Sequence, residues 1–191
     1  GFPLIGAGAP EMVKRLMAHN LERVKELRAE KVLFSCPSCY RTWKEHCETN
    51  VELVHASEFI SGLIEDGGLH LKALDDMRVT YHDPCDLGRN SGIYDAPRKI
   101  IESIPGLTLV EMRNNREKSV CCGGGGNLEM ADPALAGILA HDRLQEIQGD
   151  GAKTVLTACQ QCLRTITTSA RRQKAKLDVM DIIELVRLAI T

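Results

Sequence analysis

Residues 155–165 read VLTACQQCLRT, and residues 32–42 read VLFSCPSCYRT. The two segments share Val, Leu, both cysteines, Arg and Thr at a constant offset of 123 residues. Each is an apolar run followed by a C-x-x-C pair, which is typical of a buried strand that leads into a helix. Chance similarity of two α/β units is a poor explanation of six identities in eleven positions. The sequence therefore predicts an internal repeat.

The repeat extends beyond the cysteine pairs. Downstream, residues 53–60 resemble residues 179–186, and upstream a predicted long helix and a glycine-rich stretch precede each pair. On this alignment the chain begins after the point where a first copy would carry the equivalents of Cys85 and of the Cys121–Cys122 pair. We expect residues 1–66 to be the C-terminal half of a first cysteine-rich unit, 67–77 to be a linker, and 78–191 to be a complete second unit.

The hydrophobic pattern alternates between helical and strand periods. This predicts an α/β fold of two pseudo-repeated units with mainly parallel sheets flanked by helices, the first unit being incomplete at its N-terminus. Ser57 is the expected cap of one helix, and Asp132 with Pro133 are the expected start of another. We expect helices at 11–30, 40–49, 57–64, 97–104, 132–148, 163–172 and 181–190, and strands at 32–34, 51–54, 79–81, 107–112, 154–157 and near 179.

Composition excludes several classes of function. Hydrophobic residues make up 43% and charged residues 26% of the 191 residues, which is typical of a globular protein with a packed core. The net charge of -2 and the aromatic content of 4% give no basis for a nucleic-acid partner. No apolar run reaches the length of a membrane span, and the first residues lack the pattern of a signal peptide. We expect a cytoplasmic protein that reaches the inner face of a membrane through partners, if at all.

Eight cysteines are many for a chain of this length. Two C-x-x-C pairs, Cys36 with Cys39 and Cys159 with Cys162, favour metal or redox chemistry over structural disulfides. A helix that starts at such a pair favours the thiolate through its exposed N–H groups.

The adjacent pair Cys121–Cys122 needs a bent backbone if both side chains are to face one site. The four glycines that follow it, residues 123–126, supply that freedom. A phosphate-binding loop is a weaker interpretation of these glycines, because no Lys-Ser/Thr follows them. Cys85 lies at the expected end of a strand, and such ends converge at one edge of a parallel sheet. The pattern thus predicts five thiols at one site, one more than a tetrahedral zinc or an ordinary cubane cluster needs.

This pattern resembles the cysteine-rich CCG domain family. The resemblance rests on Cys85 within HDPC, Cys121–Cys122 within CCGGGG, and Cys159 with Cys162 within CQQC. The family includes the catalytic subunit of heterodisulfide reductase and the iron–sulfur subunits of glycolate oxidase and of anaerobic glycerol-3-phosphate dehydrogenase. With the partial first copy, the resemblance covers nearly the whole chain.

The resemblance implies a cofactor, a ligand set and partners. The ligands would be Cys85, Cys121, Cys122, Cys159 and Cys162, and Cys36 with Cys39 would be the remnant of a first site. The cofactor would be an iron–sulfur cluster of the 4Fe-4S type, non-cubane in one form of the family, with zinc as the alternative. The partners would be other redox subunits, either flavoproteins or ferredoxin-type iron–sulfur proteins.

The predicted function is an iron–sulfur electron-transfer subunit of a heterodisulfide reductase-like or dehydrogenase complex. Two alternatives stay open: reductive cleavage of a disulfide at a non-cubane cluster, and a zinc-binding structural or docking module.

Cys47 has no counterpart in the second copy and is expected to be a free thiol. His82 is either a ligand, a hydrogen-bond donor to sulfur, or a histidine satisfied by the backbone. Arg41 and Arg164 either offset the charge of a cluster or face solvent.

Overall fold

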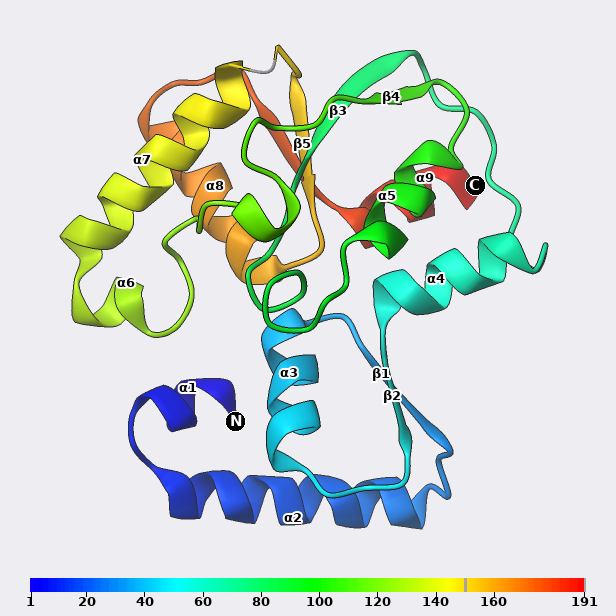
Figure 1. Ribbon diagram of the computed structural model, residues 1–191, viewed down its shortest axis with the longest axis vertical. Helices are drawn as coiled ribbons and strands as arrows, with labels where there is room; N and C mark the ends of the chain where they lie inside the picture. Colours follow the sequence, from blue (N-terminus) through cyan, green and yellow to red (C-terminus); the bar gives the residue numbers. More distant parts are fainter. Residues whose placement is uncertain (150, 191) are drawn as a thin grey trace.

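The computed structural model describes residues 1–149 and 151–190. Their regular elements alternate between helix and strand, as the periodicity predicts (Figure 1). In chain order they are α1 (Phe2–Gly6), α2 (Pro10–Glu26), β1 (Lys31–Phe34), α3 (Pro37–His46), β2 (Glu52–His55), α4 (Ala56–Glu65), β3 (Met77–His82), α5 (Asp95–Glu102), β4 (Leu107–Leu109), the 3-10 turn η1 (Arg116–Lys118), α6 (Leu128–Ala131), α7 (Pro133–Gly149), β5 (Thr154–Thr157), α8 (Gln160–Arg172), β6 (Asp178–Asp181) and α9 (Ile182–Ile190).

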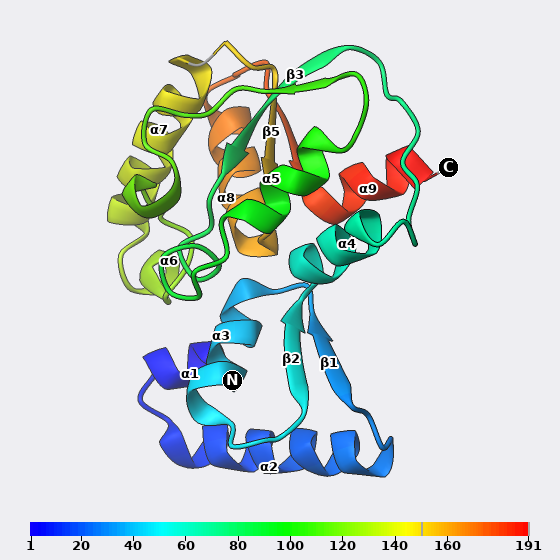
Figure 2. The ribbon, with the colours of Figure 1, turned by 45° about the vertical axis from the view of Figure 1, so that its right-hand side comes forward.

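Two parallel sheets organise the described residues. β1 pairs with β2, and a four-stranded sheet has the order β4-β3-β5-β6. The α/β class with mainly parallel sheets is thus confirmed. In Figures 1 and 2 the two-stranded sheet lies below with α1, α2 and α3, and the larger sheet lies above.

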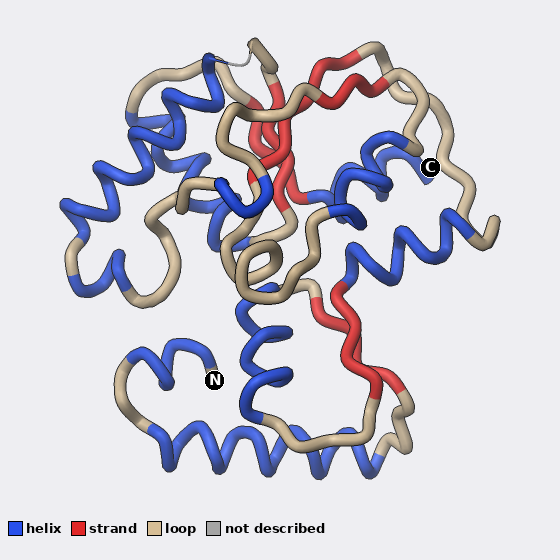
Figure 3. Tube along the Cα trace, in the orientation of Figure 1, coloured by secondary structure: helices blue, strands red, loops and turns tan. Residues whose placement is uncertain are grey.

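The larger sheet is the middle layer of three. Its central strand β5 is buried along its whole length, and β3 is buried from Val79 to His82, as expected of strands covered on both faces. On one face, Val79, Tyr81 and Leu156 share a core with residues of α5 and α9. On the other face, Val155 packs with Ile147 of α7 and with Ile166 of α8. Figure 3 shows the helices on both sides of the strands.

The helix α4 joins the two parts of the molecule. It follows β2 directly and packs against α5 and α9 of the upper layer, so the apolar core runs from Phe34 of β1 to Leu185 of α9 without interruption. Figure 2 shows α4 directly above the two-stranded sheet.

Several expected boundaries are wrong for local reasons. The helix expected at 40–49 is α3 (Pro37–His46), because Cys36 caps it and Pro37 takes its first turn. The strand expected at 107–112 ends at Leu109, and the chain then leaves the sheet at this edge position. Ser57 does not cap α4, because the N-cap is His55, whose side chain accepts from the Ser57 amide. The expected start of α7 is confirmed, with Asp132 accepting from the amide of Leu135 at 2.9 Å.

Candidate metal centre

Three distant segments of the chain meet at the carboxyl ends of β3 and β5. A small cavity there is lined by five cysteine side chains from the loop after β3, the glycine-rich loop and the start of α8. They are Cys85, Cys121, Cys122, Cys159 and Cys162. Parallel strands end at the same edge of a sheet, which explains why residues so far apart in sequence converge.

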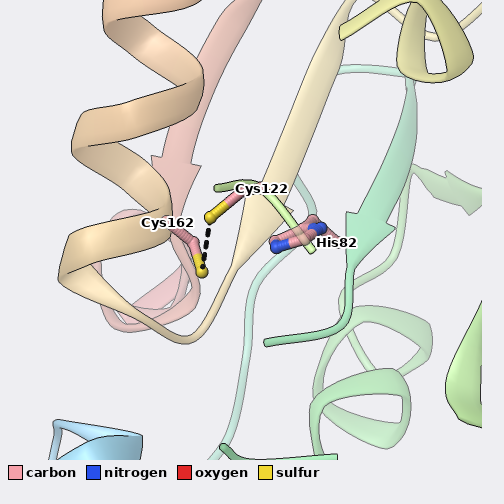
Figure 4. Close-up of side chains that lie close together, drawn as sticks. All are labelled: His82, Cys122 and Cys162. Atoms are coloured by element: carbon pink, nitrogen blue, oxygen red, sulfur yellow. Dashed lines mark hydrogen bonds between the residues drawn. The ribbon is translucent and has the colours of Figure 1, made fainter. Parts of the chain in front are cut away.

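The five thiols form a continuous series of contacts. Cys85 interacts with Cys121, Cys121 with Cys122, Cys122 with Cys162, and Cys162 with Cys159. The Sγ atoms of Cys122 and Cys162 are 3.4 Å apart (Figure 4). All eight cysteines of the chain are free thiols. The series therefore offers soft sulfur donors that are not consumed by disulfides.

The start of α8 stabilises negative charge on one of these sulfurs. Cys159 is the N-cap of α8 and Cys162 lies in its first turn. The pKa of Cys159 is lowered by the contact with Cys162 and by the backbone N–H groups of Cys162 and Gln161. A thiolate at a helix N-terminus is the arrangement that the sequence predicts.

The glycine-rich loop turns both adjacent cysteines toward the cavity. Gly123 has a φ of 81°, and a Cβ at this position would lie 2.6 Å from the carbonyl oxygen of Ala136 in α7. A residue with a side chain would therefore be strained here and would clash with α7. The Gly123 amide also donates to Cys121 Sγ at 3.3 Å.

Protons and negative charge are unevenly shared along the thiol series. The pKa of Cys121 is lowered to about 2 by its contacts with Cys122 and Cys85. The contact with Cys121 in turn raises the pKa of Cys122 to about 12 and raises that of Cys85. A metal or cluster would replace the protons of such neighbours with positive charge of its own, since thiols bind metals as thiolates.

The first C-x-x-C pair lies against this site without lining its cavity. Ser38, between Cys36 and Cys39, is a lining residue, and its hydroxyl donates to Asp86 Oδ2 at 2.6 Å. Cys36 caps α3 as Cys159 caps α8, and its side chain accepts from the Cys39 amide. Contact with Cys39 lowers the pKa of Cys36 to about 6. The two cysteine pairs therefore occupy equivalent positions at the starts of two helices, α3 and α8.

Asp86 is a site residue that the sequence pattern did not reveal. Its buried carboxylate accepts from Ser38, from Arg41 Nη1 at 3.0 Å, and from Asn90 Nδ2 at 2.8 Å. It thereby ties the loop of Cys85 to the first turns of α3. Its position directly after Cys85 is the one signal in the sequence, but nothing local indicates its partners.

Arg143 is a second site residue that was not predicted. It is fully buried in α7 and donates to His82 Nδ1 at 3.0 Å. The pKa of His82 is lowered to about 3 by burial and then by the charge of Arg143. A signal was present, because Arg143 shares the inward face of α7 with Ala136, Ala140 and Ile147, where an apolar residue is the norm.

The remaining candidates lie outside the cavity. Cys47 packs beside the main core, and burial raises its pKa. Arg41 pairs with Glu45 and Asp86, and Arg164 pairs with Glu129. Neither arginine lines the cysteine cavity.

The fold and site together define a class: a parallel α/β domain that collects thiols from three segments at the carboxyl edge of its sheet. A family model described as the cysteine-rich domain, CCG, matches residues 1–44 and 79–167. The chain belongs to the CCG cysteine-rich domain family.

Named relatives of the chain are redox proteins. It is 36% identical over 186 residues to one subunit of the dihydromethanophenazine:CoB–CoM heterodisulfide reductase of Methanosarcina acetivorans, covering 94% of this chain and 46% of the relative. It is 34% identical to one subunit of the fumarate reductase (CoM/CoB) of Methanothermobacter marburgensis, covering 99% of this chain and 38% of the relative. It is 27% identical to the probable iron-sulfur-binding oxidoreductase FadF of Bacillus subtilis, covering 91% of this chain and 25% of the relative.

The chain spans about half the length, or less, of these relatives. Among the described residues, no helix has both the length and the apolar character that crossing a membrane requires.

Proposed function

We propose that this chain is an iron–sulfur electron-transfer domain whose cluster is held by Cys85, Cys121, Cys122, Cys159 and Cys162. The observation that carries the proposal is the convergence of these five thiols around one cavity. Soft thiolate ligands select copper(I), zinc and iron–sulfur clusters among biological metal centres, so the donor set fits the cofactor.

The number of thiols favours a cluster over zinc. A structural zinc site is closed by four ligands in a tetrahedron, which would leave one thiol of the series without a role. An ordinary cubane cluster would also take four, but a non-cubane iron–sulfur cluster could use all five thiolates. The names of the relatives, among them an iron-sulfur-binding oxidoreductase, support the same choice. When bound, the cluster supplies a one-electron carrier whose potential the surrounding residues adjust.

The finer cofactor proposal is a 4Fe-4S cluster of non-cubane type. Five thiolate donors are one more than a cubane 4Fe-4S cluster takes, and this surplus supports the non-cubane form. The three buried sulfurs, Cys122, Cys159 and Cys162, would shield it from solvent.

The proposed setting is a multisubunit redox complex. Two of the relatives are named as subunits of reductases. Electrons would enter from a flavin or from a ferredoxin-type iron–sulfur partner and leave to a quinone, a disulfide or another cluster.

The proposed domain organisation is a half unit followed by a complete unit. The repeat places β1 in register with β5, which is paired on both sides. Within the described residues β1 pairs with β2 alone, and its free edge would accept a further parallel strand.

Reductive cleavage of a disulfide is the second candidate. The observation that favours it is the position of the first C-x-x-C pair, because Ser38, which lies between its two cysteines, lines the cavity of the five thiols. Two neighbouring cysteine sites could act on the two sulfurs of one substrate. The name of the heterodisulfide reductase relative points to the same chemistry.

Metal analysis of protein purified without oxygen tests the main proposal. We expect a brown protein with broad visible absorption, matching amounts of iron and acid-labile sulfide, and an electron paramagnetic resonance signal in one oxidation state. A colourless protein with one zinc per chain would refute the cluster and support the structural module. Release of thiols from an added disulfide by the reduced protein would favour the second candidate over simple electron transfer.

A further inference from the structure

His82 ends β3 beside the thiol series. It is fully buried, and one of its ring nitrogens lies within 4.8 Å of the sulfurs of Cys122 and Cys162. Figure 4 shows one ring nitrogen toward these sulfurs and the other away from them. By distance alone the three residues could form a metal site with two sulfur ligands and one nitrogen ligand.

The hydrogen bond from Arg143 argues against a histidine ligand. Arg143 Nε donates to His82 Nδ1 at 3.0 Å. A guanidinium has donors only, so Nδ1 must offer its lone pair and the imidazole proton must be on Nε2. A histidine that binds a metal ordinarily donates its second N–H to a carboxylate or carbonyl, which leaves the other nitrogen free to coordinate. In this site His82 accepts that hydrogen bond instead of donating it, so its other nitrogen, Nε2, carries the proton and has no free lone pair for a metal.

The surroundings of Arg143 hold it in this role. Its side chain is 0% exposed and pairs with Glu146 at 2.7 Å. It also donates to the carbonyl of Asn114 at 3.2 Å and to the hydroxyl of Ser119 at 3.4 Å. With its charge balanced and its other nitrogens engaged, Arg143 has little freedom to turn away from His82.

The Nε2–H group of His82 is a buried donor. Among the residues that the structure describes, Nε2 is buried without a hydrogen-bond partner. An unsatisfied buried donor is costly, and a sulfur at the thiol series would satisfy it.

We propose that His82 donates a hydrogen bond from Nε2–H to a sulfur of the cluster, and that Arg143 is the positioning residue that fixes this tautomer. The inference rests on the proposed iron–sulfur function. A hydrogen bond to cluster sulfur favours the reduced, more negative state and raises the reduction potential.

The first test uses the unaltered, cluster-loaded protein with ¹⁵N-labelled histidine. Pulsed electron paramagnetic resonance measures the coupling between the cluster spin and the nitrogen. We expect the weak coupling of a nitrogen across a hydrogen bond, absent from His82→Gln and kept in His141→Gln, which changes an exposed histidine of α7. A strong coupling typical of a directly bound nitrogen would overturn the inference, and so would no coupling at all.

The second test measures the reduction potential. His82→Leu should lower it, by 59 mV if the reduced-to-oxidised ratio at a fixed potential changes tenfold. Arg143→Met should also lower it, whereas Arg143→Lys, which keeps a donor without an acceptor, should retain most of the wild-type value. Unchanged potentials in His82→Leu and Arg143→Met would overturn the inference.

Iron content separates the two proposals. Protein without iron would refute the proposed function itself. Protein with stoichiometric iron that fails the coupling or potential test would refute only the role of His82 and Arg143.

Discussion

Cys122 and Cys47 carry the same side chain in different surroundings. Cys122 is buried in the middle of the thiol series and touches both Cys121 and Cys162, whereas Cys47 packs against apolar residues at the end of α3. We predict that Cys122→Ser lowers the iron content well below that of the wild type, because an alcohol is a poor ligand for iron in a sulfur-rich site.

Cys47→Ser is the matched control for that substitution. It should keep stoichiometric iron and the wild-type visible spectrum, both measured on protein purified without oxygen. Equal iron in the two variants would contradict the assignment of Cys122 as a ligand.

The glycine loop offers a second contrast between single residues. We predict that Gly123→Ala destabilises the protein by about 1–2 kcal/mol or more, the usual cost of a left-handed backbone for an L-residue, because Gly123 also abuts the Ala136 carbonyl. Denaturant unfolding measures the difference.

Gly125→Ala serves as the control in the same loop. Its backbone is not left-handed, and a Cβ there would meet nothing within 4 Å. The free energy of unfolding of Gly125→Ala should lie within about 0.5 kcal/mol of the wild-type value, the usual range for a substitution that meets no special feature. Equal destabilisation by both substitutions would show that the loop is not rigid in the way the structure has it.

At the scale of elements, the junctions of β2 with α4 and of β6 with α9 match in the repeat but differ in chemistry. His55 Nδ1 accepts from the Ser57 amide at 3.2 Å, and Asp181 Oδ1 accepts from the Ile183 amide at 2.9 Å. Both side chains cap the helix that follows. Of the two capping side chains, the imidazole has the ordinary pKa that lies closer to neutral pH.

This difference predicts a pH dependence of stability. Burial lowers the pKa of His55 to about 4 from its usual 6.5, so the unfolded chain binds the proton more readily. The contribution of His55 to the free energy of unfolding is therefore fully present above pH 6.5 and is lost as the pH falls toward 4. Between pH 7.5 and pH 5 this loss amounts to about 2 kcal/mol.

His55→Asn tests this dependence, because asparagine keeps the cap and does not titrate. Thermal unfolding at pH 7.5 and pH 5 should show a smaller loss for this variant than for the wild type. An identical loss would mean that His55 does not titrate as its burial predicts.

At the scale of the whole molecule, Asp86 links the two cysteine-bearing parts. Its carboxylate accepts hydrogen bonds from Ser38 and Arg41 of α3. We predict that Asp86→Ala lowers the free energy of unfolding by about 2 kcal/mol, the order of a hydrogen bond to a charged group. Hydrogen exchange should show the loss at the first turns of α3.

Asp95→Ala is the control for that prediction. Asp95 pairs with Arg116 at the surface, where its side chain is 72% exposed, and such pairs contribute little. Stability in Asp95→Ala should stay within about 0.5 kcal/mol of the wild type. If Asp86→Ala behaves in the same way, the link between the two parts is not the carboxylate.

Local patterns allowed much of this molecule to be predicted. Strand, cysteine pair and helix follow one another within a few residues, so periodicity and capping chemistry are enough to place β1, α3, β5 and α8 to within a few residues. The glycines after Cys122 indicated a bent backbone for the same reason. Helix starts were less accurate, since His55 rather than Ser57 caps α4.

What the sequence by itself determined is therefore the repeat, the parallel α/β class and which five cysteines line one cavity, because each depends on spacing along the chain. Only the tertiary structure decided that Arg143 donates to His82 across 61 residues and that Asp86 binds Ser38 across 48. No periodicity relates such residues. Their meeting depends on how α3 and α7 pack beside the sheet edge, and this packing decides which donors reach His82 and Asp86.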